Sequence, residues 1–201
     1  MAAAAGGDLH KLAMFLPAVV LAAWLAASPA VGQVPGLGPC PDVEVEHNFS
    51  VERYLGKWYE QERYFAVFEL GGNCVTAEYT DEGNGVVGVN NTMTNLVTGR
   101  TQSIKGRARL ANNTSDARLV VIFSSVGSFE APYWILGTDY DNYSVVWSCG
   151  SFGDVVNARF SWLLTRAKNP GKDIIRKMRR VLDKNGIPLQ PYMRTLQVCP
   201  N

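Results

Sequence analysis

An alternation of apolar and polar residues runs through most of the chain and limits its fold more than any other feature. From Cys40 to about residue 167 the alternation has a period of two, which is typical of strands with one buried face. Clusters of turn residues interrupt it, such as "DEGNG" at 81–85. The first predicted strand begins at Trp58, and the other seven are 73–80, 86–94, 101–110, 117–125, 132–140, 142–150 and 158–166. Short strands at this spacing predict an antiparallel barrel or a sandwich.

A helical period replaces the alternation after the eighth strand. Residues 169–186 carry an apolar stripe at helical spacing, formed by Ile174, Ile175, Met178, Val181 and Leu182. Pro170 lies near the start of this segment and Gly186 at its end, where helix boundaries favour these residues. We therefore predict one helix at 169–186, followed by a short tail strand at 194–200.

The charges of the chain are nearly balanced, with 19 basic and 18 acidic residues and a net charge of +1 at pH 7. This balance gives no general attraction to nucleic acid or to anionic membranes. The outer face of the predicted helix is nevertheless basic and carries Lys172, Arg176, Lys177, Arg179, Arg180 and Lys184. Such a face is either a solvated surface, which we favour because the whole chain is neutral, or a contact for heparin or a membrane.

The N-terminal residues have the layout of a secretory signal peptide. Lys11 precedes an apolar run at 12–27, and small residues follow that run. The run is shorter than the roughly 20 residues that a membrane-spanning helix needs, and a proline interrupts it. We expect cleavage before Gln33, which makes residues 1–32 the signal peptide and residues 33–201 a single domain of an extracellular protein.

Four cysteines lie after the predicted signal peptide: Cys40, Cys74, Cys149 and Cys199. An even number in a secreted chain implies two disulfides, and spacing alone leaves three pairings open. Their spacing excludes the short Cys or His pairs of zinc sites, and His47 is the only histidine after the predicted leader. We therefore predict neither a metal site nor a cofactor.

Five asparagines lie in Asn-X-Ser/Thr acceptor sequences for N-linked glycans, namely Asn48, Asn90, Asn112, Asn113 and Asn142. Five acceptors are many for a domain of this length. Each acceptor that carries a glycan has to face solvent.

Three separated motifs resemble the signatures of the lipocalin family. They are Gly56-Lys57-Trp58-Tyr59 in the first strand, Thr138-Asp139-Tyr140 between the sixth and seventh strands, and Arg166 at the end of the eighth strand. The resemblance covers about residues 40–201. It implies an all-β fold, an eight-stranded antiparallel up-and-down β-barrel with one C-terminal helix packed outside. It also implies that Trp58 and Arg166 stack at the closed end of the barrel, as a cation–π pair.

The chain resembles most closely the apolipoprotein D branch of this family, which includes related insect lipocalins. The segments 48–60 and 131–143 carry this similarity. It implies the disulfides Cys40–Cys149 and Cys74–Cys199, and it makes Asn112 the first choice for a glycan. Each disulfide closes a long loop, which contributes about 4–5 kcal/mol in the chain-entropy model.

Within such a barrel the alternation predicts which side chains point inward. The resemblance implies ligand contacts at several of these positions: Tyr79, Asn91, Phe123, Tyr133, Trp162 and Leu164. Alternation alone adds Val89 and Met93, and it also turns inward Val75, Ala77, Val87, Leu119, Val121, Ile135 and Phe160. We expect Tyr79, Val89, Asn91, Met93, Phe123, Tyr133, Trp162 and Leu164 to bind ligand. This mostly apolar set favours a lipophilic pocket over a filled core.

The predicted function is therefore a secreted carrier of a small hydrophobic ligand, such as a fatty acid, a sterol or steroid, a retinoid or a bilin. The alternative is a scavenger or antioxidant protein that associates with a membrane or lipoprotein surface through loops such as 126–134, which contains Phe129. A third hypothesis is an enzyme, because one lipocalin branch isomerises a prostaglandin with an unpaired pocket cysteine. Two disulfides leave no such thiol here, so we expect no catalytic residues. We also expect a monomer or a weak oligomer without a nucleic-acid partner.

Overall fold

The computed structural model describes residues 34–111, 115–125, 127 and 130–199. The predicted signal peptide and the acceptors Asn112 and Asn113 lie outside the described residues. The strands are β1 (Val34–Leu37), β2 (Gly56–Tyr64), β3 (Gly72–Gly83), β4 (Val86–Asn95), β5 (Thr101–Leu110), β6 (Arg118–Ile122), β7 (Ala131–Thr138), β8 (Tyr143–Phe152), β9 (Val156–Thr165) and β10 (Tyr192–Arg194).

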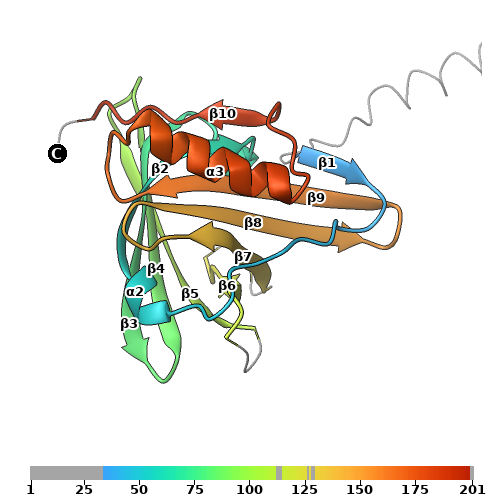
Figure 1. The fold of residues 1–201 in the computed structure, drawn as a ribbon. Coiled ribbons are helices and arrows are strands. Elements are labelled where there is room, and N and C mark those ends of the chain that lie inside the picture. The colour runs from blue at the N-terminus through green and yellow to red at the C-terminus, as the bar shows by residue number, and fades with distance from the viewer. Residues whose placement is uncertain (1–33, 112–114, 126, 128–129, 200–201) are drawn as a thin grey trace, which may run out of the picture. The chain divides into compact units, whose positions relative to one another are not determined.

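Strands β2 to β9 follow one another around a closed antiparallel barrel (Figure 1). Each strand pairs with the next in sequence, and β9 pairs with β2 as well as with β8, which closes the ring. Strand β1 is added to β9 outside this ring, and β10 is added to β2. The predicted eight-stranded up-and-down barrel is therefore confirmed, and the alternative of a sandwich is wrong.

The antiparallel order sorts the connections between strands into two sets. Those that join β2 to β3, β4 to β5, β6 to β7 and β8 to β9 lie at one end of the barrel, which we call the open end. Those that join β3 to β4, β5 to β6 and β7 to β8 lie at the other end, which we call the closed end. A short helix, α2 (Val51–Tyr54), leads into β2 at the closed end, and a 3-10 turn, η1 (Val67–Glu69), lies in the β2–β3 connection at the open end.

The tail differs from its prediction. A strand was predicted at 194–200, but the strand observed is β10, which ends at Arg194. Beyond it the tail is held by isolated bonds, because Cys74 donates its N–H to the carbonyl of Leu196 at 2.7 Å and Gln197 donates to the carbonyls of Glu60 and Val75. These contacts do not form a ladder. The elements β1, α2 and η1 were not predicted at all.

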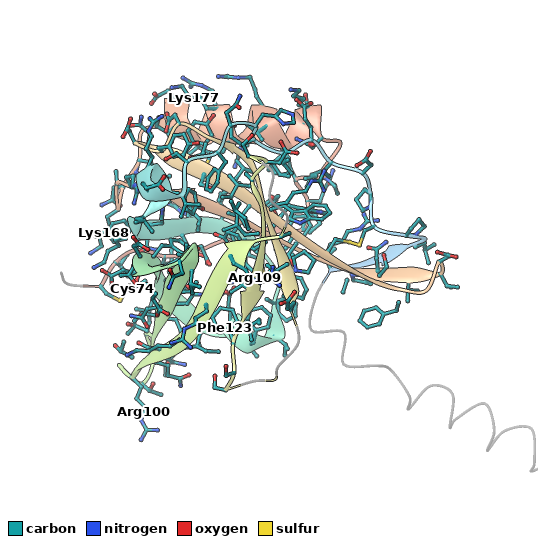
Figure 2. The ribbon with its side chains drawn as sticks, turned by 90° about the horizontal axis from the view of Figure 1, so that it is seen from below. Cys74, Arg100, Arg109, Phe123, Lys168 and Lys177 are labelled. Atoms are coloured by element: carbon teal, nitrogen blue, oxygen red, sulfur yellow. A yellow bond between two sulfur atoms is a disulfide. The ribbon has the colours of Figure 1, made fainter. Side chains whose placement is uncertain are left out.

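The predicted helix is α3 (Lys172–Lys184), which lies along the outside of the barrel against β7 and β8 (Figure 1). Its apolar stripe buries Met178 and Leu182 completely in a second core between helix and barrel. Gly137 on β7 permits the close approach, because a Cβ at that position would lie 3.1 Å from Val181. Lys177 points away from the barrel on the exposed face of the helix (Figure 2).

Both disulfides pair as the resemblance implies. Cys40 is bonded to Cys149, and this bond ties the N-terminal segment to β8. Cys74 is bonded to Cys199, and this bond ties the tail to β3. All four cysteines of the chain are therefore used.

Trp58 and Arg166 meet at the closed end. The indole of Trp58 is fully buried and donates its Nε1–H to the carbonyl of Tyr54 at 2.9 Å. The guanidinium of Arg166 lies over this ring, with Cζ 3.8 Å from the ring centroid. It also donates to the carbonyls of Leu55 at 2.8 Å, Lys57 at 2.9 Å and Tyr140 at 2.9 Å. One side chain thus joins the end of α2, the start of β2 and the β7–β8 turn.

The other signature residues shape the backbone around this pair. Gly56 has a φ of +90°, which disfavours any residue with a side chain, and a Cβ there would lie 3.3 Å from Nη1 of Arg166. Thr138 donates its hydroxyl to the carbonyl of Tyr143 at 2.6 Å. Asp139 accepts the N–H of Asn142 at 2.8 Å through its carboxylate. These two residues fix the β7–β8 turn that presents a carbonyl to Arg166.

Replacing the guanidinium should weaken the whole barrel. We expect Arg166→Ala to lower the free energy of unfolding by about 2–4 kcal/mol, because it leaves several partly buried carbonyls without this donor and removes the stack on Trp58. Urea denaturation followed by tryptophan fluorescence measures the change. Arg180→Ala, on the exposed face of α3, serves as the control and should change stability by less than about 0.5 kcal/mol. Equal effects of the two substitutions would contradict the role given to Arg166.

Candidate ligand-binding cavity

The barrel encloses a cavity of about 540 Å³. Small-molecule sites have volumes of roughly 300–1,000 Å³, so the space suits one modest ligand. Apolar and aromatic side chains form most of the wall, including Val75 and Ala77 from β3, Val87 from β4 and Phe160 from β9. Phe49 and Leu55, which precede β2, complete the wall near the closed end.

The structure brings together all eight residues that were predicted to bind ligand. The wall of this one cavity includes Tyr79, Val89, Asn91, Met93, Phe123, Tyr133, Trp162 and Leu164. Phe123 reaches it from just beyond the end of β6 (labelled in Figure 2). Ile135, which was predicted to face inward, is fully buried in the core of the barrel and does not reach the cavity wall. Whether the eight residues contact a ligand stays a prediction.

A chain of hydroxyl groups lies in the wall towards the closed end. The Tyr79 and Tyr133 hydroxyls are 2.6 Å apart, and the Tyr133 and Tyr54 hydroxyls are 3.3 Å apart. The Tyr54 hydroxyl also lies 2.9 Å from Oγ of Ser144, which is fully buried. Tyr54 stands on α2, and its backbone carbonyl accepts hydrogen bonds from Nε1 of Trp58 and Nη2 of Arg166.

These tyrosines are neutral at physiological pH. Burial raises the pKa of Tyr54 to about 12. Burial and the neighbouring phenols raise the pKa values of Tyr79 and Tyr133 well above their usual range. The closed end of the cavity can therefore exchange hydrogen bonds with a ligand but carries no charge. Asn91 adds a carbonyl oxygen that is buried and has no hydrogen-bond partner among the described residues.

Two carboxylates and a guanidinium form a second polar group in the wall. Arg63 lies between the two acids, with Nη1 2.6 Å from Oε1 of Glu60 and Nε 3.0 Å from Oε2 of Glu69. Trp162 donates its Nε1–H to the carboxylate of Glu69, at 3.3 and 3.4 Å from the two oxygens. Thr195 from the tail donates its hydroxyl to Glu60. Both Glu60 and Glu69 line the cavity.

Burial affects the ionisation of both acids. It raises the pKa of Glu69 to about 8, with a further contribution from the negative charge of Glu60 and against the effect of Arg63. Burial also raises the pKa of Glu60, although Arg63 and Thr195 oppose this change. Sequence reasoning missed both acids, because the set of side chains that it predicted to face inward was mostly apolar and contained no charged residue. The one signal for Glu60 was its spacing of two from the inward-facing Trp58.

The described acceptor asparagines differ in their surroundings. Asn48 and Asn142 are exposed, and Asn142 donates Nδ2–H to the carboxylate of Asp139 at 3.0 Å. Asn90 is only half-exposed in the middle of β4. Attachment of glycans to these residues stays a prediction.

Known proteins share this architecture and much of this sequence. A family model described as a lipocalin-like domain matches residues 49–197, which include all eight barrel strands and α3. The chain belongs to the lipocalin family. This lipocalin is 39% identical to apolipoprotein D of Mus musculus, over 86% of this chain and 90% of that protein. It is 36% identical to the Lazarillo protein of Schistocerca americana, over 79% of this chain and 74% of that protein.

Solved structures share the lipocalin architecture as well. Insecticyanin of the tobacco hornworm Manduca sexta matches this lipocalin with a TM-score of 0.72 at 23% identity, over 82% of this chain and 89% of that chain. The resemblance to the apolipoprotein D branch is thus confirmed by sequence, and the barrel fold by structure. Among the described residues, the lipocalin has no group of three or more acidic, His or Cys side chains that could hold a metal ion. The same residues contain no helix long and apolar enough to cross a membrane.

The raised pKa of Glu69 should make stability depend on pH. Between the ordinary value of 4.5 and the folded value of about 8, the folded lipocalin binds more protons than the unfolded chain, so its free energy of unfolding falls as pH rises. We expect a fall of about 3 kcal/mol between pH 5.5 and 8.5 that Glu69→Gln removes, measured by urea denaturation. Glu78→Gln, an exposed site on β3, is the control. An unchanged pH slope in Glu69→Gln would contradict the assignment.

Proposed function

We propose that this lipocalin is a secreted carrier that holds one small hydrophobic molecule in its barrel. The observation that carries the proposal is the cavity of about 540 Å³, walled by apolar side chains and closed at one end by Trp58 and Arg166. The candidate ligands are a fatty acid, a sterol or steroid, a retinoid or a bilin. Secretion follows from the predicted signal peptide and agrees with two disulfides.

The proposed role is binding rather than catalysis. The lipocalin isomerase chemistry considered above needs an unpaired thiol, and both disulfides together use every cysteine of this chain. The cavity wall formed by the described residues holds no histidine and no cysteine, and none of its serine and threonine hydroxyls hydrogen-bonds to Glu60 or Glu69. A nucleophile with an adjacent base is therefore not among the wall residues.

Identifying the cargo is the direct test of carriage. We would purify the secreted protein from its native source, extract it with organic solvent and analyse the extract by mass spectrometry. A stoichiometric lipophile supports the carrier proposal and names the ligand.

Filling the cavity should abolish carriage. Ala77→Phe places a phenyl ring into the cavity from β3, and we expect it to weaken binding of the neutral lipophiles retinol and progesterone at least about tenfold. Quenching of tryptophan fluorescence reports binding, because Trp162 stands in the wall. Thr80→Phe adds the same ring at an exposed position of β3 and should leave the affinity unchanged. Failure of both lipophiles to bind the wild-type protein would count against the proposal.

A second candidate function is association with a lipid surface through the loops. Large apolar side chains are exposed on the open-end connections. In the β2–β3 connection these are Val67 and Phe68 of η1 and the adjacent Leu70. Val97 lies in the β4–β5 connection and Val155 in the β8–β9 connection. None of the described closed-end connections exposes a large apolar side chain. This one-sided distribution favours a scavenger that contacts a membrane or lipoprotein with its open end. Phe129, the loop residue first considered for this role, lies outside the described residues.

Liposome flotation separates surface association from carriage in solution. We expect the delipidated protein to float with neutral phosphatidylcholine vesicles. A triple variant, Phe68→Ser with Val97→Ser and Val155→Ser, should lower the bound fraction at least about threefold, because it removes exposed apolar area. Lys177→Ser with Arg180→Ser on α3 is the control and should change nothing. A loss of flotation in the helix variant alone would assign the contact to the basic face instead.

A further inference from the structure

The charges in the cavity wall are not balanced. Glu60 and Glu69 both line the cavity, while Arg63 is the one cation among the described residues that contacts them. No lysine, arginine or histidine stands in the wall formed by the described residues. Two acids therefore share one guanidinium beside a largely apolar space.

Arg63 is engaged within the protein and is not itself part of the cavity wall. Its Nε lies 3.0 Å from Oε2 of Glu69 in an ion pair. Its Nη1 donates to Glu60 at 2.6 Å and to the Thr195 hydroxyl at 2.8 Å, and its Nη2 donates to the carbonyls of Glu69 at 2.9 Å and Gly72 at 3.3 Å. A guanidinium has five N–H groups, of which the four on Nη1 and Nη2 donate hydrogen bonds within the protein, while Nε takes part in the ion pair with Glu69. The anionic head group of a fatty acid thus finds no basic partner in the wall.

Of the two acids, Glu60 makes the contacts that connect β2 to the C-terminal tail. Glu60 joins Arg63 and Thr195, and this contact ties β2 to the tail. Arg63 holds the start of β3 through the carbonyl of Gly72. Glu69 is the second acid, and it stands on η1 at the open end, where a ligand enters.

We propose that the cavity selects lipophilic amines, whose ammonium group lies against the carboxylate of Glu69 while the apolar body fills the barrel. The inference rests on the proposed carrier function and narrows it, away from fatty acids. Without a ligand, burial keeps a proton on the acid pair. An ammonium can replace this proton as the second positive charge beside the two acids, whereas a ligand carboxylate adds negative charge beside them. A neutral lipophile fills the apolar part without either effect.

Binding of such an amine depends on pH in a characteristic way. The groups that face Glu69 are Glu60 and Arg63 from β2 and the indole of Trp162 from β9. An ammonium displaces the proton that burial keeps on the acid pair. Amine affinity should therefore rise up to about tenfold per pH unit from pH 6 to 8, where an alkylamine stays charged.

The test compares three ligands that share one chain and differ in the head group. Dodecylamine, 1-dodecanol and dodecanoate are titrated into the delipidated secreted protein by calorimetry, below their aggregation concentrations, at pH 6, 7 and 8. We expect the amine to bind at least about tenfold more tightly than the acid at pH 8. Glu69→Gln should abolish this ratio, whereas Glu78→Gln, the same change at an exposed site of β3, should keep it.

The outcomes separate this inference from the carrier proposal. Equal affinity for the three ligands, or tighter binding of dodecanoate, overturns the amine preference and leaves carriage intact. Absence of binding for all three argues against carriage itself. A preference that survives in Glu69→Gln overturns the assignment to Glu69. The wild-type comparison and its pH dependence decide the matter even where the variant does not fold.

Discussion

The contact between Arg166 and Trp58 is the constraint on which the rest of the structure depends. A barrel with an apolar interior can hold a cavity only when one end is sealed against water. Here the seal is an indole with a guanidinium at 3.8 Å, and the guanidinium also binds carbonyls from three separate segments. Burial lowers the pKa of Arg166, but an arginine keeps its charge in proteins, so the cost of its desolvation is offset by these acceptors. Glycine is required at position 56 beside this guanidinium, because φ is +90° there and a Cβ would lie 3.3 Å from Nη1 of Arg166.

Much of the fold could be read from the sequence because its main signal is local. A period of two assigns each residue of a strand to one face without knowledge of its partners. That rule placed Val89, Met93 and Trp162 in the interior, and the cavity wall contains all three. The helix was also predicted from a local signal, because the apolar stripe that ends at Leu182 repeats with the period of a helix. The resemblance to a family supplied the disulfide pairing, which spacing had left open.

The polar parts of the cavity could not be derived in this way, since they depend on irregular backbone. Tyr54 stands on a single helical turn, and Glu69 on a 3-10 turn, and neither element has a periodic signal. Arg63 is buried beside Glu60 because the pairing of β2 with β9 shifts register between Glu60 and Glu62. A bulge of this kind reverses the alternation locally, so a residue that strict alternation from Trp58 would turn outward points inward. The tail, which supplies Thr195, gives no periodic signal at all.

The two polar groups give the cavity a direction. Near the closed end the tyrosine hydroxyls form a neutral chain that ends at the buried Ser144. Towards the open end, two acids share one guanidinium, and burial keeps a proton on the pair that a ligand cation can replace. A charged head group loses less hydration near the mouth than at the floor, whereas an apolar body gains most from the enclosed wall. A ligand with one cationic end therefore has a single favourable orientation, in which its ammonium stays nearest to water and its apolar end reaches towards Trp58.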